Sequence, residues 1–136
     1  MTQADAIAIL KTGQNVFLTG EPGAGKSHTV NTFVAWLRSH GISVAVTAST
    51  GIASTHIGGM TIHSWSGIGI AKFLSKNDLQ EIATRDKVVR RVKYTRVLII
   101  DEISMLDGRT LTMVDAVCKT VRKNPAPFGG LQVVLV

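Results

Sequence analysis

Residues 20–27 carry the residue types of a phosphate-binding loop at the spacing that such a loop requires. They read Gly-Glu-Pro-Gly-Ala-Gly-Lys-Ser and match the Walker A pattern G-x-x-x-x-G-K-[ST]. The glycines let backbone N–H groups approach a phosphate closely, because no side chain stands in the way. We expect the Lys26 ammonium to reach the terminal phosphates of a nucleotide and the Ser27 hydroxyl to hold Mg²⁺. The alternative is an ordinary glycine turn before a helix.

A second pair of residues that could take part in catalysis is Asp101 and Glu102, directly after the apolar run 97–100. A continuous apolar run fits a buried strand of a parallel sheet, and ligands bind beyond the carboxyl ends of such strands. We expect Asp101 to hold Mg²⁺ through water and Glu102 to orient and deprotonate an attacking water. Such a pair favours hydrolysis over simple nucleotide binding. Taken alone, the pair could also be a solvated acidic turn.

Apolar patterning predicts the elements that must position these groups. The run 16–18 predicts a strand at about 16–19, and apolar residues at 30, 33, 34 and 37 predict a helix over 26–39. His40 and Gly41 would end that helix, with Gly41 as its C′ residue. The other expected elements are a helix at 3–11, strands at 43–48, 96–100 and 131–136, a basic helix at 78–93, a helix at 107–122, and loops with short helical turns over 49–70. A strand and helix pair thus lies between the strands of the two nucleotide motifs. In phosphate-loop proteins with an extra strand there and a glutamate after the aspartate, hydrolysis typically drives mechanical work.

Composition narrows the class of protein. The chain has 136 residues, 45% of them hydrophobic, which suits one domain with a genuine core. It contains no apolar run near the roughly 18 residues that span a bilayer, and its start lacks the layout of a signal peptide, so we expect a cytosolic protein. Cys118 is the only cysteine, which excludes an internal disulfide and predicts a small core residue. The chain ends on an apolar strand, from which we expect an N-terminal fragment of a longer protein.

Positive charge is concentrated in one part of the chain. The net charge is +6 and the isoelectric point about 9.9. This balance fits a polyanionic partner. For the basic segment 72–96, taken alone, a solvated helix face is an equal alternative. Eight of the fifteen basic residues fall in this segment: Lys72, Lys76, Arg85, Lys87, Arg90, Arg91, Lys93 and Arg96.

Several stretches together resemble one family. They are Asn-Val-Phe-Leu-Thr-Gly at 15–20, Thr-Ala-Ser-Thr-Gly-Ile-Ala at 47–53, Thr-Ile-His-Ser-Trp-Ser-Gly-Ile-Gly at 61–69, Asp-Glu-Ile-Ser-Met-Leu at 101–106, extended through Arg122, and Phe-Gly-Gly-Leu-Gln at 128–132. With them, essentially the whole chain resembles the Pif-type (petite integration frequency) DNA helicases of superfamily one, which are close to RecD. Gln3 lies twelve residues before Asn15, where that family has a glutamine that reads adenine.

The resemblance implies a fold and an activity. The fold would be a three-layer α/β/α RecA-like phosphate-loop NTPase domain with a mainly parallel sheet, covering residues 1–136 and ending before the third family motif. The activity would be an ATP- and Mg²⁺-dependent motor on single-stranded DNA that moves 5′ to 3′ and unwinds duplexes and G-quadruplexes. Members serve replication, repair, recombination and telomere maintenance. We expect a monomeric motor without a membrane partner, cytoplasmic in bacteria or phage-type systems and nuclear or mitochondrial in eukaryotes.

The resemblance also assigns roles to residues. Glu102 and Lys26 would be catalytic, and Ser27 and Asp101 would bind the metal. Six residues would contact single-stranded DNA: Thr47, Ser49, Thr50, His63, Ser64 and Trp65, of which Trp65 either stacks on a base or is a buried packing residue. The ATP-binding set would be Gln3, Gly20, Glu21, Pro22, Gly23, Ala24, Gly25, Lys26, Ser27 and His28, although His28 also reads as a surface residue.

Two other functions stay open at this stage. The first is a module that binds ATP or DNA without turnover, because the second RecA-like domain with its arginine fingers and the glutamine that senses the terminal phosphate are not in this chain. The second is another phosphate-loop class, either an AAA-type ATPase or a small-molecule kinase. A kinase has little use for the hydroxyl-rich stretch 47–50.

Overall fold

The protein contains a parallel sheet of five strands in the order β1-β5-β4-β2-β3. The computed structural model describes residues 1–20, 25–57 and 59–136. Each strand pair in this part of the chain is parallel. The strands are β1 (Val16–Phe17), β2 (Val44–Ala48), β3 (Met60–Thr61), β4 (Val97–Asp101) and β5 (Gln132–Leu135).

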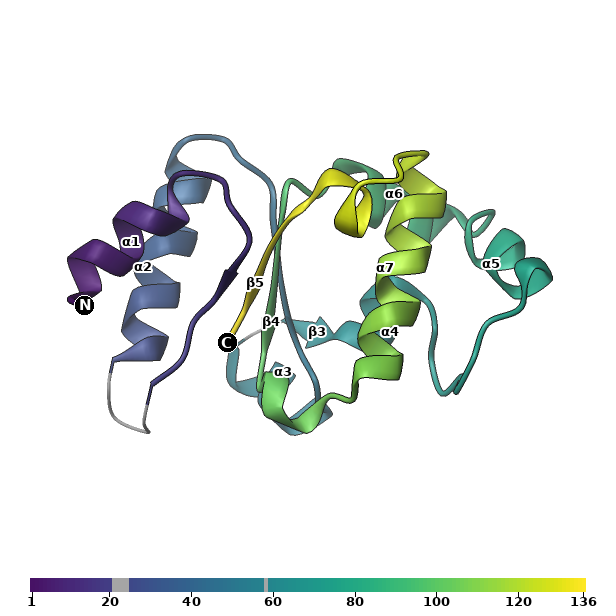
Figure 1. Cartoon of the computed structure of the whole chain (residues 1–136), viewed down its shortest axis with the longest axis horizontal. Coiled ribbons are helices and arrows are strands. Elements are labelled where there is room, and N and C mark those ends of the chain that lie inside the picture. The colour runs from purple at the N-terminus through teal and green to yellow at the C-terminus, as the bar shows by residue number, and fades with distance from the viewer. Residues whose placement is uncertain (21–24, 58) are drawn as a thin grey trace.

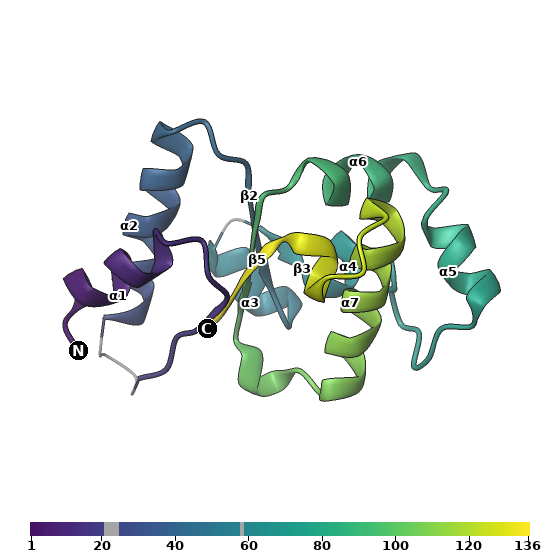
Figure 2. The same ribbon diagram turned by 45° about the horizontal axis from the view of Figure 1, so that its top comes forward.

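Helices cover both faces of this sheet (Figure 1). On one face lie α1 (Gln3–Leu10) and α2 (Lys26–Ser39), and on the other lie α4 (Ile62–Ser66), α6 (Asp86–Tyr94) and α7 (Gly108–Arg122). The two groups of helices remain on opposite sides of the strands in the turned view of Figure 2. The expected three-layer α/β/α fold is therefore confirmed.

Strand β4 shows why the sheet needs both layers. Its side chains alternate between two cores: Val97 and Ile99 pack with the α2 layer, whereas Leu98 and Ile100 pack with the α7 layer. All four are at most 3% exposed. A strand buried on both faces is continuously apolar rather than alternating, which is the pattern of 97–100 in the sequence.

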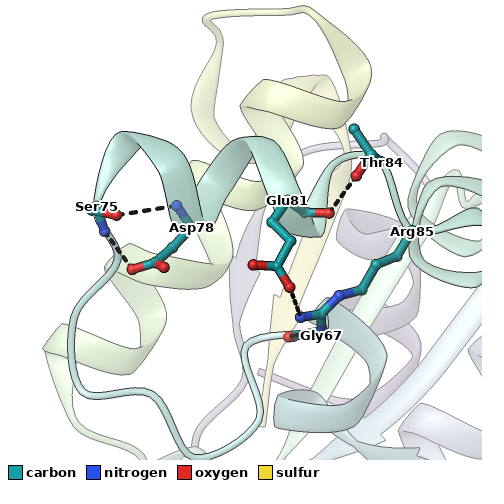
Figure 3. Close-up of polar contacts among 6 residues, drawn as sticks. All are labelled: Gly67, Ser75, Asp78, Glu81, Thr84 and Arg85. Carbon is teal, nitrogen blue, oxygen red and sulfur yellow. Dashed lines mark hydrogen bonds and ion pairs between the residues drawn. The ribbon is translucent and has the colours of Figure 1, made fainter.

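The expected helix over 78–93 is wrong, because two helices replace it. Helix α5 (Lys76–Ile82) ends before Arg85, which has an extended backbone (φ −75°, ψ 118°) and precedes α6. Figure 3 shows the contacts that stabilise this break. The Thr84 hydroxyl donates to the Glu81 carbonyl at 2.7 Å, and the Arg85 guanidinium donates to the Glu81 carboxylate at 3.0 Å and to the Gly67 carbonyl at 3.3 Å. Side-chain bonds of this kind compete with continuation of a helix.

The segment 49–70 contains the expected short helical turns, together with one strand that the sequence did not predict. Helix α3 (Gly51–Ile57) follows β2, and β3 leads directly into α4. Strand β3 pairs only with the last two residues of β2. Such a short edge strand has too few residues for a period-two pattern to identify it.

Arg122 ties the end of α7 to α6 and to the turn before β5. Its Nη1 donates to the carbonyls of Val92, Lys93 and Thr95 at 3.0–3.2 Å, and its Nε donates to the Gly129 carbonyl at 2.8 Å. Gly129 belongs to the 3₁₀ turn η2 (Pro127–Gly130) and has φ +63°. These bonds set the position from which β5 enters the centre of the sheet.

Two further expectations can be compared with the structure. Cys118 is fully buried in the core beneath α7, and burial raises the pKa of its thiol to about 12. It is therefore the small core residue that the sequence predicted. No helix in the described part of the chain has the length and apolar character needed to cross a membrane.

Candidate nucleotide and DNA site

The candidate residues gather at the carboxyl edge of the sheet. Because the strands are parallel, their carboxyl ends lie on one edge, where α3 and the C-terminal residue also lie in Figure 1. Strand β5 separates β1 from β4, so the strand before the phosphate loop and the strand before Asp101 are not neighbours. Ligands of open α/β sheets bind at this edge.

The described part of the phosphate loop leads into the first turn of α2. Gly25 is the N-cap residue with φ 84° and ψ 16°, a left-handed conformation that glycine adopts without penalty. Lys26 is half-buried, and Ser27 and His28 are exposed. The first N–H groups of a helix have no intrahelical partner, so this turn offers donors to an anion. The predicted ligands Glu21, Pro22, Gly23 and Ala24 lie outside the described residues.

Gln3, the predicted adenine-reading residue, lies beside the end of this loop. A Cβ atom placed on Gly25 would be 2.0 Å from Gln3 Nε2. The position of Gln3 follows from a capping box, in which Thr2 and Asp5 bond each other's backbone N–H groups at 3.1 and 3.2 Å and begin α1. The fold thus brings Gln3 next to Gly25. Its contact with adenine stays a prediction.

Asp101 and Glu102 form a tight acidic turn at the end of β4. Asp101 is half-buried, pairs with Ala48 of β2, and accepts a hydrogen bond from the Glu102 N–H at 2.8 Å. The Glu102 backbone is left-handed, with φ 57° and ψ 43°, and its side chain is exposed. The turn continues into the 3₁₀ helix η1 (Ile103–Met105). The sequence did not predict this backbone, because glutamate is not a residue that signals positive φ.

The chemistry of these residues fits Mg²⁺. Ser27 in the first turn of α2 and Asp101 at the end of β4 both offer oxygen atoms, which this hard cation prefers. The described residues contain no cluster of three or more His, Cys, Asp or Glu side chains that could hold a metal alone. A Mg²⁺ ion here would therefore share its coordination between these side chains, phosphate oxygens and water, as is usual for this cation.

Three of the residues predicted to contact DNA have side chains that point into the protein and not toward solvent. Thr47 is fully buried and its hydroxyl donates to the Ile99 carbonyl at 2.7 Å. Ser49 is 7% exposed and its hydroxyl donates to the Glu102 carbonyl at 2.7 Å. Trp65 is 2% exposed and packs in the core of the α7 layer, as the packing alternative predicted, so its ring offers no free face to a base in this structure.

The remaining predicted contacts are accessible. Thr50 is half-exposed, and its hydroxyl accepts from the Ala53 N–H at 3.1 Å at the start of α3. His63 is half-exposed and Ser64 is exposed on α4. Both line a hollow of about 650 Å³ together with the cations of Lys72 and Arg109. Their side chains can therefore meet a phosphate backbone.

Two charged residues of this hollow were not among the predicted site residues. Arg109 and Asp107 lie at the start of α7, where the sequence showed only an expected helix. The Asp107 carboxylate caps α7 by accepting from the Thr110 N–H at 2.7 Å. This hydrogen bond is the main cause that lowers the pKa of Asp107 below its ordinary value of 3.8. Asp107 is thus an N-cap, and Arg109 is a cation that faces the hollow.

Two arginines of the basic segment bond the backbone of α4 and its C-cap. Arg91 donates to the Trp65 carbonyl at 3.3 Å and to the Ser64 carbonyl at 3.0 Å. Arg85 donates to the Gly67 carbonyl, as Figure 3 shows. Both guanidinium groups bond carbonyls at the end of α4, the helix that carries His63 and Ser64. All the cations of the segment other than Arg91 are exposed, Arg85 included: Lys72, Lys76, Arg85, Lys87, Arg90, Lys93 and Arg96.

Comparison with known proteins gives one consistent set of relatives. Residues 2–136 match the family model described as PIF1-like helicase. The chain is 53% identical over 135 residues to the ATP-dependent DNA helicase Pif1 of Psychrobacter sp. (strain PRwf-1), an alignment that covers 99% of this chain and 20% of that protein.

Solved structures agree with this result. The crystal structure of Pif1 helicase from Candida albicans superposes with a TM-score of 0.91 at 41% identity, covering 98% of this chain and 31% of that chain. The structure of Pif1 helicase from Bacteroides in complex with ADP-AlF3 and single-stranded DNA superposes with a TM-score of 0.83 at 31% identity, covering 98% and 30% of the two chains. The chain thus spans 20% of the curated relative and about a third of these structures.

Proposed function

The chain belongs to the PIF1-like helicase family, and we propose that residues 1–136 form the first RecA-like motor domain of an ATP-dependent DNA helicase. One arrangement supports this proposal above all others. The first turn of α2, the acidic turn at Asp101 and Glu102, and the segment from Thr50 to Ser64 all follow carboxyl ends of strands in one parallel sheet. A nucleotide site and a DNA site built on one sheet edge can influence each other directly.

In the ATP reaction, the chain's own groups bind phosphate and move one proton. Backbone N–H groups of residues 20–28 and the Lys26 ammonium would hold the phosphates, and Gln3 would recognise adenine. Ser27 and Asp101 would hold Mg²⁺, which supplies charge neutralisation at the phosphates when bound. Glu102 would orient the attacking water and accept its proton. The comparison structure solved with ADP-AlF3 supports nucleotide binding for this family.

On the DNA side, accessible groups suit contacts that do not read sequence. Thr50, His63 and Ser64 would meet backbone phosphates, with Lys72 and Arg109 adding positive charge. We propose a monomeric motor that moves 5′ to 3′ on single-stranded DNA and unwinds duplexes and G-quadruplexes in genome maintenance. Its compartment would be the cytoplasm in bacteria, or the nucleus or mitochondria in eukaryotes. A second RecA-like domain, with arginine fingers, would complete the motor.

The test is ATP hydrolysis with and without single-stranded DNA, measured for this chain and for a full-length protein that carries it. We expect strong DNA stimulation of the full-length protein and very little turnover by residues 1–136 alone, because arginine fingers can contribute about 10³–10⁵ in rate. Lys26→Ala should abolish turnover and unwinding. Lys11→Ala is the matched control, because this lysine lies over the Trp36 ring at the end of α1 and outside the site. A full-length protein without DNA stimulation, or an active Lys26→Ala variant, would contradict the proposal.

A further inference from the structure

The acidic turn has a backbone that glutamate does not adopt by itself. Glu102 lies in the left-handed region, with φ 57° and ψ 43°. Residues with a Cβ atom are disfavoured there, so the surrounding structure must hold the conformation. The direction of the Glu102 side chain depends on this backbone, because φ and ψ decide where the Cα–Cβ bond points. Whatever holds the turn therefore also aims the proposed catalytic carboxylate.

Three hydrogen bonds hold Glu102, and one of them comes from a distant segment. Its N–H donates to the Asp101 carboxylate at 2.8 Å, and its carbonyl accepts from the Met105 N–H at 3.0 Å. The same carbonyl accepts from the Ser49 hydroxyl at 2.7 Å. The Ser49 N–H also donates to the Asp101 carbonyl at 3.1 Å. Ser49 therefore bonds two successive carbonyls of the acidic turn, and it is 7% exposed, so water competes little for its hydroxyl.

Ser49 is also joined directly to a proposed DNA contact. The next residue, Thr50, begins α3: its hydroxyl accepts from the Ala53 N–H at 3.1 Å and its carbonyl accepts from the Ser54 N–H at 2.9 Å. One peptide bond thus separates the residue that holds Glu102 from the residue that starts α3. A displacement of Thr50 can therefore pass directly to Ser49, and with it to the hydroxyl that bonds the Glu102 carbonyl.

We propose that Ser49 is a positioning residue for Glu102 and transmits DNA binding at Thr50 to ATP hydrolysis. This inference rests on the proposed function of the chain. When DNA engages Thr50 and the start of α3, the Ser49 hydroxyl shifts the Glu102 peptide and turns the carboxylate toward the attacking water. Ser49 itself touches neither nucleotide nor DNA in this scheme, so its removal should lower turnover without weakening the binding of either ligand.

The main test compares Ser49→Ala with wild type in the full-length protein. We expect DNA-stimulated kcat to fall about 10- to 100-fold, since a misplacement of about 1 Å can cost about 100-fold. The KM for ATP and the Kd for single-stranded DNA should change little. Thr95→Val is the matched control, because Thr95 is also 7% exposed and its hydroxyl donates to the Arg91 carbonyl at 2.6 Å, at the other end of β4. Equal losses of kcat in both variants, or unchanged DNA stimulation in Ser49→Ala, would overturn the proposal.

A second measurement needs no variant. Hydrogen exchange of the wild-type protein, with single-stranded DNA and without nucleotide, should change at the amides of Glu102 and Met105, which close the acidic turn. Unchanged exchange at these amides on a DNA-saturated protein would overturn the coupling. The two proposals fail differently. If wild type shows no DNA-stimulated hydrolysis, the proposed function fails, whereas normal stimulation that survives Ser49→Ala defeats only the role of Ser49.

Discussion

Gly129→Ala should destabilise the protein strongly, because Gly129 combines a left-handed backbone with close contact to α7. Its φ is +63°, and an added Cβ would lie 2.6 Å from the Cys118 carbonyl oxygen and 3.0 Å from Arg122 Cδ. The obstructing oxygen belongs to the backbone of α7, which packs on the core through Cys118, so the turn η2 must move instead. That movement would strain the bond from Arg122 Nε to the Gly129 carbonyl, now 2.8 Å.

The magnitude follows from two contributions. A left-handed conformation costs a residue with a Cβ atom about 1–2 kcal/mol. Loss of a hydrogen bond from a charged donor adds about 1.5–3 kcal/mol. We therefore expect Gly129→Ala to lower the free energy of unfolding by roughly 2.5–5 kcal/mol, a large part of the about 5–15 kcal/mol that holds a typical domain together.

Gly41→Ala is the matched control. Gly41 has φ +68°, and an added Cβ would meet no atom within 4 Å. Its substitution should cost only the backbone contribution of about 1–2 kcal/mol. The assay is urea unfolding of both variants and wild type. The midpoints are compared under the condition that the slope of the unfolding free energy against urea concentration stays the same. If the two variants lose equal stability within about 0.5 kcal/mol, the contact between η2 and α7 is not what requires glycine, and the reasoning fails.

Three further predictions concern the site and its supports. Trp65→Ala should lower the free energy of unfolding by about 3–5 kcal/mol, because it empties a core position. The Trp65→Phe variant, if it folds, should keep its affinity for single-stranded DNA in a binding titration. A large loss of affinity in that variant would indicate that Trp65 contacts a base after all. The lowered pKa of Asp107 means that its carboxylate stabilises the fold above its ordinary pKa of 3.8 and that this contribution disappears as pH falls through the lowered value. Asp107→Ala should therefore be less stable than wild type near neutral pH, and the difference in urea midpoint should vanish in acid; a constant difference would contradict the cap. Glu102→Gln should leave ATP binding intact and stop turnover in the full-length protein, and surviving turnover would remove Glu102 as the base.

Most of the elements were predictable because their signals are local. The helix expected over 26–39 is α2 (Lys26–Ser39), and the run 97–100 became the buried part of β4. Apolar spacing and a following Gly41 are enough to define such a helix, and four consecutive apolar residues are enough to define such a strand. The prediction of one helix over 78–93 was wrong because the signal for its break is not entirely local. One of the bonds at its break, from Arg85 to the Gly67 carbonyl, joins residues 18 positions apart and is not visible in the local pattern.

The sequence by itself determined which chemistry the chain carries: a phosphate loop with Lys26 and Ser27, and an acidic pair at Asp101 and Glu102. Only the tertiary structure decided which hydroxyls are available for DNA. Because β2 pairs with β4 along its whole length, Thr47 and Ser49 turn their hydroxyls toward carbonyls of that neighbouring segment. Residue types and spacing determine what a side chain can bond, but the strand order decides which partner it meets. The bond from Ser49 to Glu102, for example, joins residues 53 positions apart.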